Sequence, residues 1–88
     1  MKIVIEDCVK VLGRGIVIVC KPPEELFEYV DDFSYACKIK SGETITIDDL
    51  RYAIKGVEQL STSKSVGLVI SGVDDCNKLI GKDFEYLK

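Results

Sequence analysis

Four cysteines and no histidine limit the chemistry available to this chain of 88 residues. The cysteines are Cys8, Cys20, Cys37 and Cys76, and no two of them form a C-x-x-C pair. Structural zinc sites take thiolates from such close pairs, because a tight turn aims both sulfurs at one metal. The spacing therefore predicts four free, structural thiols and no metal, with a metal site or a functional disulfide as the alternatives.

Catalytic groups are also scarce. A Ser-His-Asp or Cys-His arrangement needs a histidine, and the chain has none. Adjacent acids occur at Asp31-Asp32, Asp48-Asp49 and Asp74-Asp75, where they are typical of turns and caps rather than of an acid–base couple. No phosphate-binding G-x-x-x-x-G-K-[ST] loop is present, since Gly81-Lys82 is followed by Asp83. We therefore expect a protein without enzymatic activity, catalytic residues or cofactors.

The charge distribution indicates which partners to expect. Twelve Lys and Arg stand against 15 Asp and Glu, a net charge of −3, whereas binders of duplex DNA are usually basic. This balance excludes duplex DNA but leaves room for a local site for one nucleotide or one RNA end. Acids gather in one stretch without an intervening base: Glu24, Glu25, Glu28, Asp31 and Asp32. That stretch is either a solvated loop or short helix, or an acidic docking surface for a basic partner.

Short alternating apolar segments between glycine-rich turns predict a chain made mostly of strands. Strands are expected near residues 2–11, 15–20, 33–40, 44–47, 51–60, 66–70 and 83–87, counting one as an extension of its neighbour. Ile3, Ile5, Val9 and Val11 are expected on one face of the first strand. Its turn into the second strand should give Gly13 or Gly15 a positive φ. Short helical turns are expected over residues 23–30 and after Asp74. This count predicts a small closed six-stranded antiparallel β-barrel, which leaves no exposed edge.

The ends and apolar runs bear on location. The longest uninterrupted apolar run is Ile16 to Cys20, far shorter than a membrane span. The first seven residues carry charges and no apolar signal segment. We therefore expect a cytoplasmic protein with no membrane partner.

Four blocks of the sequence, taken in order, resemble domain 2 of translational GTPases, above all that of elongation factor Tu. The blocks are Ile5-Glu6-Asp7 with Gly13-Arg14-Gly15-Ile16-Val17, Gly42 to Ile47, Lys55-Gly56-Val57-Glu58, and Val66 to Val73 with Leu79-Ile80-Gly81-Lys82. The resemblance covers nearly all of residues 1–88 and implies a single six-stranded barrel without the GTPase domain. Asn77-Lys78-Leu79-Ile80 lacks the aspartate of a guanine-reading motif, so GTP binding is not implied. Residues 21–37 match poorly and are interpreted as an insertion.

In this family the barrel holds the 3′ end of aminoacyl-tRNA, so the resemblance also implies an RNA-end pocket. By position, its residues here are Val11, Gly13, Arg14, Gly15, Val17, Glu58 and either Leu68 or Val69. Apolar walls would hold an adenine, and Glu58 would accept its hydrogen bonds. Ser61 and Ser71 replace two family arginines, which removes cations for phosphate or ribose. The alternative is that Val11, Val17 and Val69 belong to the barrel core.

Two functions remain after these exclusions. The first is a binding module for a protein partner, docked through the 21–37 insertion; its candidate residues are Glu24, Glu25, Phe27, Glu28 and Tyr29. The second is a module that binds an RNA 3′ end in the adenosine pocket. The net negative charge and the two serines favour the protein partner.

Overall fold

The computed structural model describes residues 1–59, 64–73 and 75–86, and these residues form an all-β protein. The strands are β1 (Lys2–Val11), β2 (Gly15–Cys20), β3 (Phe27–Tyr29), β4 (Tyr35–Cys37), β5 (Thr44–Ile47), β6 (Leu50–Ala53), β7 (Gly56–Gln59), β8 (Val66–Ile70) and β9 (Asp83–Tyr86). Two 3-10 turns accompany them, η1 (Glu24–Leu26) and η2 (Cys76–Leu79). No helix in these parts of the chain has the length and apolarity to cross a membrane.

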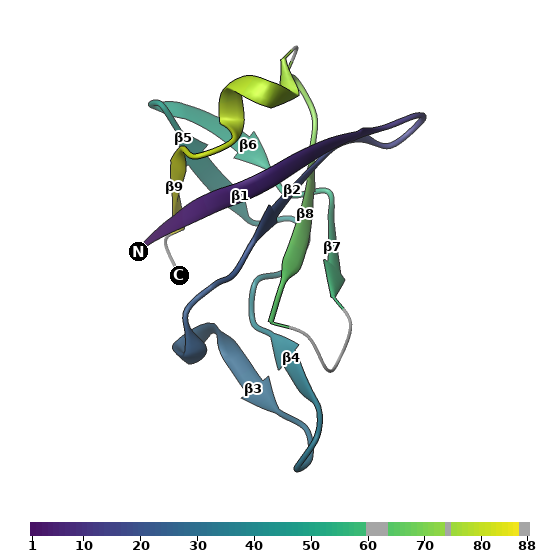
Figure 1. Ribbon diagram of the computed structural model, residues 1–88, viewed down its shortest axis with the longest axis vertical. Helices are drawn as coiled ribbons and strands as arrows, with labels where there is room; N and C mark the ends of the chain where they lie inside the picture. The colour runs from purple at the N-terminus through teal and green to yellow at the C-terminus, as the bar shows by residue number, and fades with distance from the viewer. Residues whose placement is uncertain (60–63, 74, 87–88) are drawn as a thin grey trace.

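The strands form a seven-stranded antiparallel sheet, in the order β6-β5-β9-β1-β2-β8-β7, and a separate β3–β4 hairpin (Figure 1). β6 and β7 are the two ends of the large sheet, yet only Ile54 and Lys55 separate them along the chain. Ile54 N–H donates to the Glu43 carbonyl at 2.8 Å, and Lys55 N–H donates to the Val69 carbonyl of β8 at 2.7 Å. In place of one continuous strand over 51–60, the structure therefore has β6 and β7, and the chain changes neighbours at residues 54 and 55. Leu60 lies outside the described residues.

A bulge in β1 decides which of its side chains reach the core. The register with β2 shifts between Ile5 and Asp7, so that one extra residue enters β1 there. As a result Ile3, Ile5 and Cys8 are buried, whereas Val9 is 48% exposed. The expectation that Val9 and Val11 share a face with Ile3 and Ile5 is wrong, because the bulge turns the rest of the strand over.

Two tight turns depend on left-handed backbone. Gly13, in the turn after β1, and Gly15, the first residue of β2, have φ values of 81° and 109°, which confirms the predicted hairpin turn. Asp48 and Asp49, between β5 and β6, have φ values of 50° and 66°. Two consecutive positive φ values are typical of the two-residue turns that match the twist of a β-hairpin, and aspartate tolerates them better than most residues do.

The core is built from the inward faces of the large sheet, with β-branched and aromatic side chains. Its fully buried side chains are Ile5, Ile18, Cys20, Ile39, Ile45, Ile47, Ile54, Val66, Leu68, Ile70, Phe84 and Tyr86. Leu26, Phe27 and Cys37 extend this core toward the β3–β4 hairpin. The short helix expected over 23–30 is wrong beyond its first turn, because burial of Phe27 draws the chain into β3.

Candidate functional site

The first candidate site is the outer face, defined here as the side of β1, β2, β8 and β7 turned away from the core. The strand registers align Val9 with Val17, Val17 with Val69, and Val69 with Gly56. Val69 is only 4% exposed but does not belong to the core cluster, so it forms a buried floor on this face. Val9, Val11, Val17, Val19 and Val69 lie on the part of this face where β1, β2 and β8 pair.

Gly67 of β8 leaves space on the outer face between side chains of the two neighbouring strands. Gly67 is the register partner of Glu58 on β7. A Cβ atom placed on Gly67 would lie 2.9 Å from Cγ1 of Val17 and 3.7 Å from Cβ of Glu58. Since the first distance is too short for two carbon atoms, Val17 occupies space that any larger residue at position 67 would need.

Arg14 closes one side of this outer face. Its Nη2 atom lies 2.7 Å from Oε1 of Glu58, and the side chains of both residues are about half exposed at 53% and 48%. The turn of Gly13 and Gly15 positions Arg14 here, helped by donation from Arg14 N–H to the Val11 carbonyl at 3.1 Å. The result is an apolar floor with a carboxylate and a guanidinium at its rim, which suits a flat ring that carries a polar edge.

The structure brings together most, but not all, of the residues predicted for the RNA-end pocket. Arg14, Val17, Glu58 and Val69 share the outer face, and Val11 lies at the edge of that face next to Gly15. Leu68 is wrong as a pocket residue, because its side chain is fully buried in the core on the other side of β8. The alternative that these valines are core residues fits only Val69, which is buried at 4% exposure, whereas Val11 and Val17 are partly exposed and lie outside the core cluster.

The second candidate site is the β3–β4 hairpin, which extends away from the large sheet (Figure 1). An isolated two-stranded hairpin is at best marginally stable, so its anchoring matters. Phe27 is 5% exposed and packs into the core, and its ring meets Tyr35 edge-on with centroids 5.5 Å apart. Tyr35 in turn meets Tyr29 at 5.8 Å. Phe27 is therefore wrong as a docking residue: it is the anchor of the hairpin.

Glu24 is paired within the protein. The Tyr29 hydroxyl donates to Glu24, and Lys64 Nζ donates to both carboxylate oxygens at 2.9 Å. The Tyr29 hydroxyl and then Lys64 lower the pKa of Glu24, while the pKa values of Tyr29 and Lys64 are raised by their hydrogen bonds to it. Lys64 Nζ also lies 5.4 Å from the Tyr35 ring centroid. Of the three predicted docking glutamates, Glu25 and Glu28 are exposed and make no ion pair with any described residue.

The tip of the hairpin, residues 30–34, presents apolar side chains in an ordered turn. Val30 N–H donates to the Ser34 carbonyl at 3.0 Å, and Phe33 N–H donates to Oδ1 of Asp31 at 2.8 Å. The hydrogen bond from Phe33 N–H, and then hydrogen bonds from Ser34, lower the pKa of Asp31. Val30 is 70% exposed, Phe33 84% and the adjacent Tyr29 61%. Sequence reasoning missed Val30 and Phe33; the available signal was two large apolar residues flanking adjacent acids.

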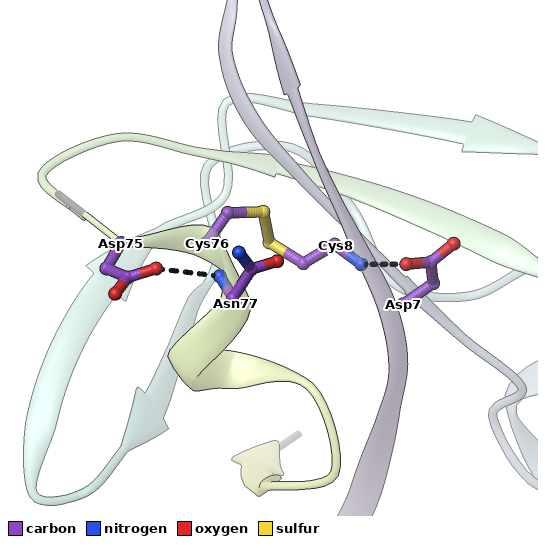
Figure 2. Close-up of a disulfide and its surroundings, with 5 residues drawn as sticks. All are labelled: Asp7, Cys8, Asp75, Cys76 and Asn77. Atoms are coloured by element: carbon purple, nitrogen blue, oxygen red, sulfur yellow. Dashed lines mark hydrogen bonds between the residues drawn. A yellow bond between two sulfur atoms is a disulfide. The ribbon is translucent and has the colours of Figure 1, made fainter.

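The expectation of four free thiols is wrong for two of them. Cys8 of β1 and Cys76 of η2 form a disulfide with Cα atoms 5.7 Å apart (Figure 2). Asp75 caps η2 by accepting from Asn77 N–H at 3.0 Å; the predicted cap, Asp74, lies outside the described residues. Cys20 and Cys37 are buried and do not take part in this disulfide. No group of three or more metal-ligating side chains occurs in the described ranges.

The third candidate site is a hollow between the β5–β6 turn and η2. Its lining residues are Asp48, Tyr52, Gly72, Val73, Asp75, Lys78, Leu79 and Lys82. Lys82 forms an ion pair with Asp48 across it. Because two lysines are balanced by two aspartates, the hollow favours neither anions nor cations.

Comparison with known proteins adds no relative. No protein-family model matches the chain, and neither a curated protein nor a solved structure matches it. The likeness to translation-factor domain 2 therefore remains a prediction from the four sequence blocks. The outer face and the β3–β4 hairpin are therefore the two surfaces that bear on function.

Proposed function

We propose that this protein is a non-enzymatic binding module that docks a basic protein partner on its β3–β4 hairpin. The observation that carries the proposal is the exposure of three apolar side chains within an acidic segment: Val30 and Phe33 at the tip of the hairpin, and Tyr29 next to it. Residues 22–37 contain five acids and no lysine or arginine. A rigid aromatic surface with a charged surround is what protein interfaces use for anchoring and for specificity.

The anchoring of the hairpin supports this function over a simple solvated loop. A loop with no role in binding has no need for a buried phenylalanine, an edge-to-face ladder of rings and an ordered tip. These contacts hold Val30 and Phe33 in solvent, where they are unfavourable for the isolated protein. Among the exposed acids, Glu25 and Glu28 remain to attract a basic surface, since Glu24 is neutralised by Lys64.

The test is site-specific crosslinking. A photo-reactive amino acid at position 33 should capture the partner in native lysate, whereas the same group at Leu50, 60% exposed on β6, should not. The double change Glu25→Lys with Glu28→Lys should abolish the crosslink at position 33. Its effect should be largest at low salt, where charges are least screened. The control pair Glu6→Lys with Asp83→Lys changes the net charge equally and should leave the crosslink intact. Capture that is equal at positions 33 and 50 would refute the proposal.

We infer further that the seven-stranded sheet is a closed six-stranded barrel of the translation-factor domain 2 type. In this view β6 and β7 are two halves of one bent strand that pairs with β5 and then with β8. The two-residue separation of β6 from β7 supports it, as do the backbone bonds of Ile54 toward Glu43 and of Lys55 toward Val69. Such closure leaves no edge on the large sheet.

A second candidate function, binding of an RNA 3′ end, is favoured by the outer face. There Glu58 stands beside the apolar floor of Val17 and Val69, with Arg14 next to it. RNA ending in CCA should bind more tightly than the same RNA without the terminal adenosine. Glu58→Ala should weaken this binding by about 1–3 kcal/mol, because it removes a hydrogen-bond acceptor for the base. Equal binding of the two RNAs would exclude this function.

The disulfide bears on the compartment in which this module works. Disulfides persist mainly in oxidising environments. The Cys8–Cys76 bond therefore weighs against the cytoplasmic location expected from the first residues.

A further inference from the structure

The hydrogen bonds inside the β3–β4 hairpin define which backbone groups face outward. Lys38 N–H donates to the Leu26 carbonyl at 2.7 Å, and Val30 N–H donates to the Ser34 carbonyl at 3.0 Å. In an antiparallel pair the bonded residues alternate with residues whose backbone groups point to the outside. Glu28 and Ala36, midway between these bonds, therefore face each other. The backbone groups of Phe27 and Tyr29 point away from β4.

One edge of the hairpin is covered by the protein itself. Cys37 N–H donates to Oε1 of Gln59 at 2.7 Å, and Nε2 of Gln59 donates to the Tyr35 carbonyl at 3.3 Å. The amide of this β7 side chain thus offers β4 one acceptor and one donor, as the backbone of a neighbouring strand would. The Cys37 N–H and the Tyr35 carbonyl on the outward edge of β4 are therefore already bonded within the protein.

The other edge, on β3, is open. Phe27 N–H donates to the Glu24 carbonyl and closes η1. The Phe27 carbonyl and both backbone groups of Tyr29 have no hydrogen-bond partner among the described residues, since β3 pairs only with β4. In Figure 1 this side of β3 faces away from the rest of the chain. Exposed strand edges are templates for pairing with another chain.

We propose that the open edge of β3 receives an extended segment of the partner protein as an added strand, in which basic and apolar residues alternate. This inference rests on the proposed function, because it specifies how the hairpin binds its partner. The Tyr29 N–H and carbonyl would exchange hydrogen bonds with one residue of that segment, and the Phe27 carbonyl would accept a further bond. Main-chain bonds of this kind supply affinity, and alternate side chains supply specificity.

The two faces of the hairpin dictate the side chains of the added strand. Phe27, Tyr29 and Tyr35 lie on one face and form the aromatic ladder. Glu28 lies on the opposite face, because side chains alternate along a strand. The partner residue opposite Tyr29 would therefore be apolar or aromatic, and the residues on either side of it would be lysine or arginine, next to Glu28.

The same charges argue against a second copy of this chain as the occupant. Pairing two β3 edges would bring Glu25, Glu28, Asp31 and Asp32 of one copy close to the same acids of the other. Like charges facing each other across strands are destabilising. A basic segment turns this repulsion into attraction.

The probe for the test is an octapeptide of alternating valine and lysine, added to the isotope-labelled protein and followed by NMR. The Tyr29 N–H signal should shift, and its exchange with solvent should slow. An analogue N-methylated at its valines keeps the charge and side chains but cannot donate to the edge. We expect this analogue to bind at least tenfold more weakly, and an octapeptide of alternating valine and glutamate not to bind.

A matched pair of protein variants tests the same edge of β3, complementing the change made in the peptide. Tyr29→Pro and Tyr29→Val both lose the ring and the hydroxyl, but only the first loses the backbone N–H. Proline at this position spares the bonds to β4, because Tyr29 N–H points outward. Tyr29→Pro should bind the Val-Lys peptide at least tenfold more weakly than Tyr29→Val does. If Tyr29→Pro fails to fold, the N-methylated peptide on the unaltered protein still decides the question.

The outcomes separate this inference from the proposed function. Equal affinity for the N-methylated and unmodified peptides, with shifts only at Phe33 and the exposed acids, would overturn strand addition but leave hairpin docking intact. Absence of peptide binding would also overturn strand addition, and the crosslink at position 33 would still report on docking. A dimer that Tyr29→Pro dissociates and Tyr29→Val does not would show that the occupant is a second copy, against the proposal.

Discussion

Gly13 and Gly15 flank the same turn but have different surroundings. At Gly13 a Cβ atom would meet nothing within 4 Å, whereas at Gly15 it would lie 2.8 Å from the Ile70 carbonyl oxygen. We expect Gly13→Ala to lower the free energy of unfolding by about 1 kcal/mol through its positive φ alone. Gly15→Ala should lower it by about 3 kcal/mol, because a backbone clash is added. Urea denaturation measures both, and equal losses would contradict this account.

Two buried groups should make the protein sensitive to alkaline pH. Burial raises the pKa of the Cys20 thiol from 9.0 to about 12. Burial, and then donation of a hydrogen bond to Glu43, raises the pKa of Tyr86 above its ordinary 10.0. The unfolded chain therefore releases these protons at lower pH than the native protein, so stability is full below about pH 9 and falls as the pH rises further.

The measurement is the free energy of unfolding between pH 8 and about 11, from urea titrations. Cys20→Ala should remove the part of the loss that begins near pH 9, and Tyr86→Phe the part that begins near pH 10. The two variants serve as controls for one another. A pH profile that neither substitution changes would show that other groups cause the loss.

Among the elements, the hairpin depends on a side chain from β7. Gln59→Ala would remove the bonds to Cys37 N–H and to the Tyr35 carbonyl. Because each such bond contributes about 1 kcal/mol, we expect hydrogen exchange at the Cys37 amide to accelerate roughly tenfold. Gln59→Glu retains the acceptor for Cys37 but loses the donor for Tyr35, so its effect on the Cys37 amide should be smaller. Unchanged exchange in Gln59→Ala would contradict this role for the side chain.

Alternation and turn chemistry were sufficient to place several strands. β1, β2, β5 and β8 match the predicted ranges, because β-branched runs end at glycines, prolines or paired acids. Periodicity does not reveal hydrogen-bond partners, so it could not show that β6 pairs with β5 and that β7 then pairs with β8. It also could not foresee β3, since burial of Phe27 overrides the local preference for a helical turn after Pro23.

The candidate sites were predictable to a similar extent. Similarity to a known family placed Arg14, Val17, Glu58 and Val69 in one pocket, and the structure brings them to one face. It gave no way to choose between Leu68 and Val69, a choice that depends on the face of β8 each occupies. The hairpin lies in residues 21–37, which the similarity does not cover. The Lys64 and Gln59 contacts were missed because they are distant in sequence.

For the molecule as a whole, the Cys8–Cys76 bond is the main covalent constraint. Its residues are 68 apart in sequence, so it removes much of the freedom of the unfolded chain. The chain-entropy relation gives about 4 kcal/mol for a loop of this length. We expect Cys8→Ser with Cys76→Ser to lower the free energy of unfolding by roughly that amount. Cys8→Ser alone is the control and should have a similar effect, since either change breaks the bond.

A thiol titration checks the pairing directly. In denaturant without reductant, two thiols per chain should react, from Cys20 and Cys37, and four should react after reduction. Four reactive thiols without reductant would show that the bond does not form. In a Cys20→Ala, Cys37→Ala variant, only Cys8 and Cys76 remain. Two reactive thiols in this variant without reductant would also show that the bond does not form.

The ring that this bond closes also determines how the chain responds to mechanical force. Residues 9–75 lie inside the ring, and only residues 1–7 and 77–88 lie outside it. When the two ends of the oxidised protein are pulled, the force is transmitted through the disulfide. Most of the strands lie inside the ring and therefore bear no load. The chain can then lengthen by little more than those outer segments, about 3.5 Å per residue. With a reducing agent present, the same force acts on every strand. On unfolding, the end-to-end length of the chain then increases severalfold more than in the oxidised protein.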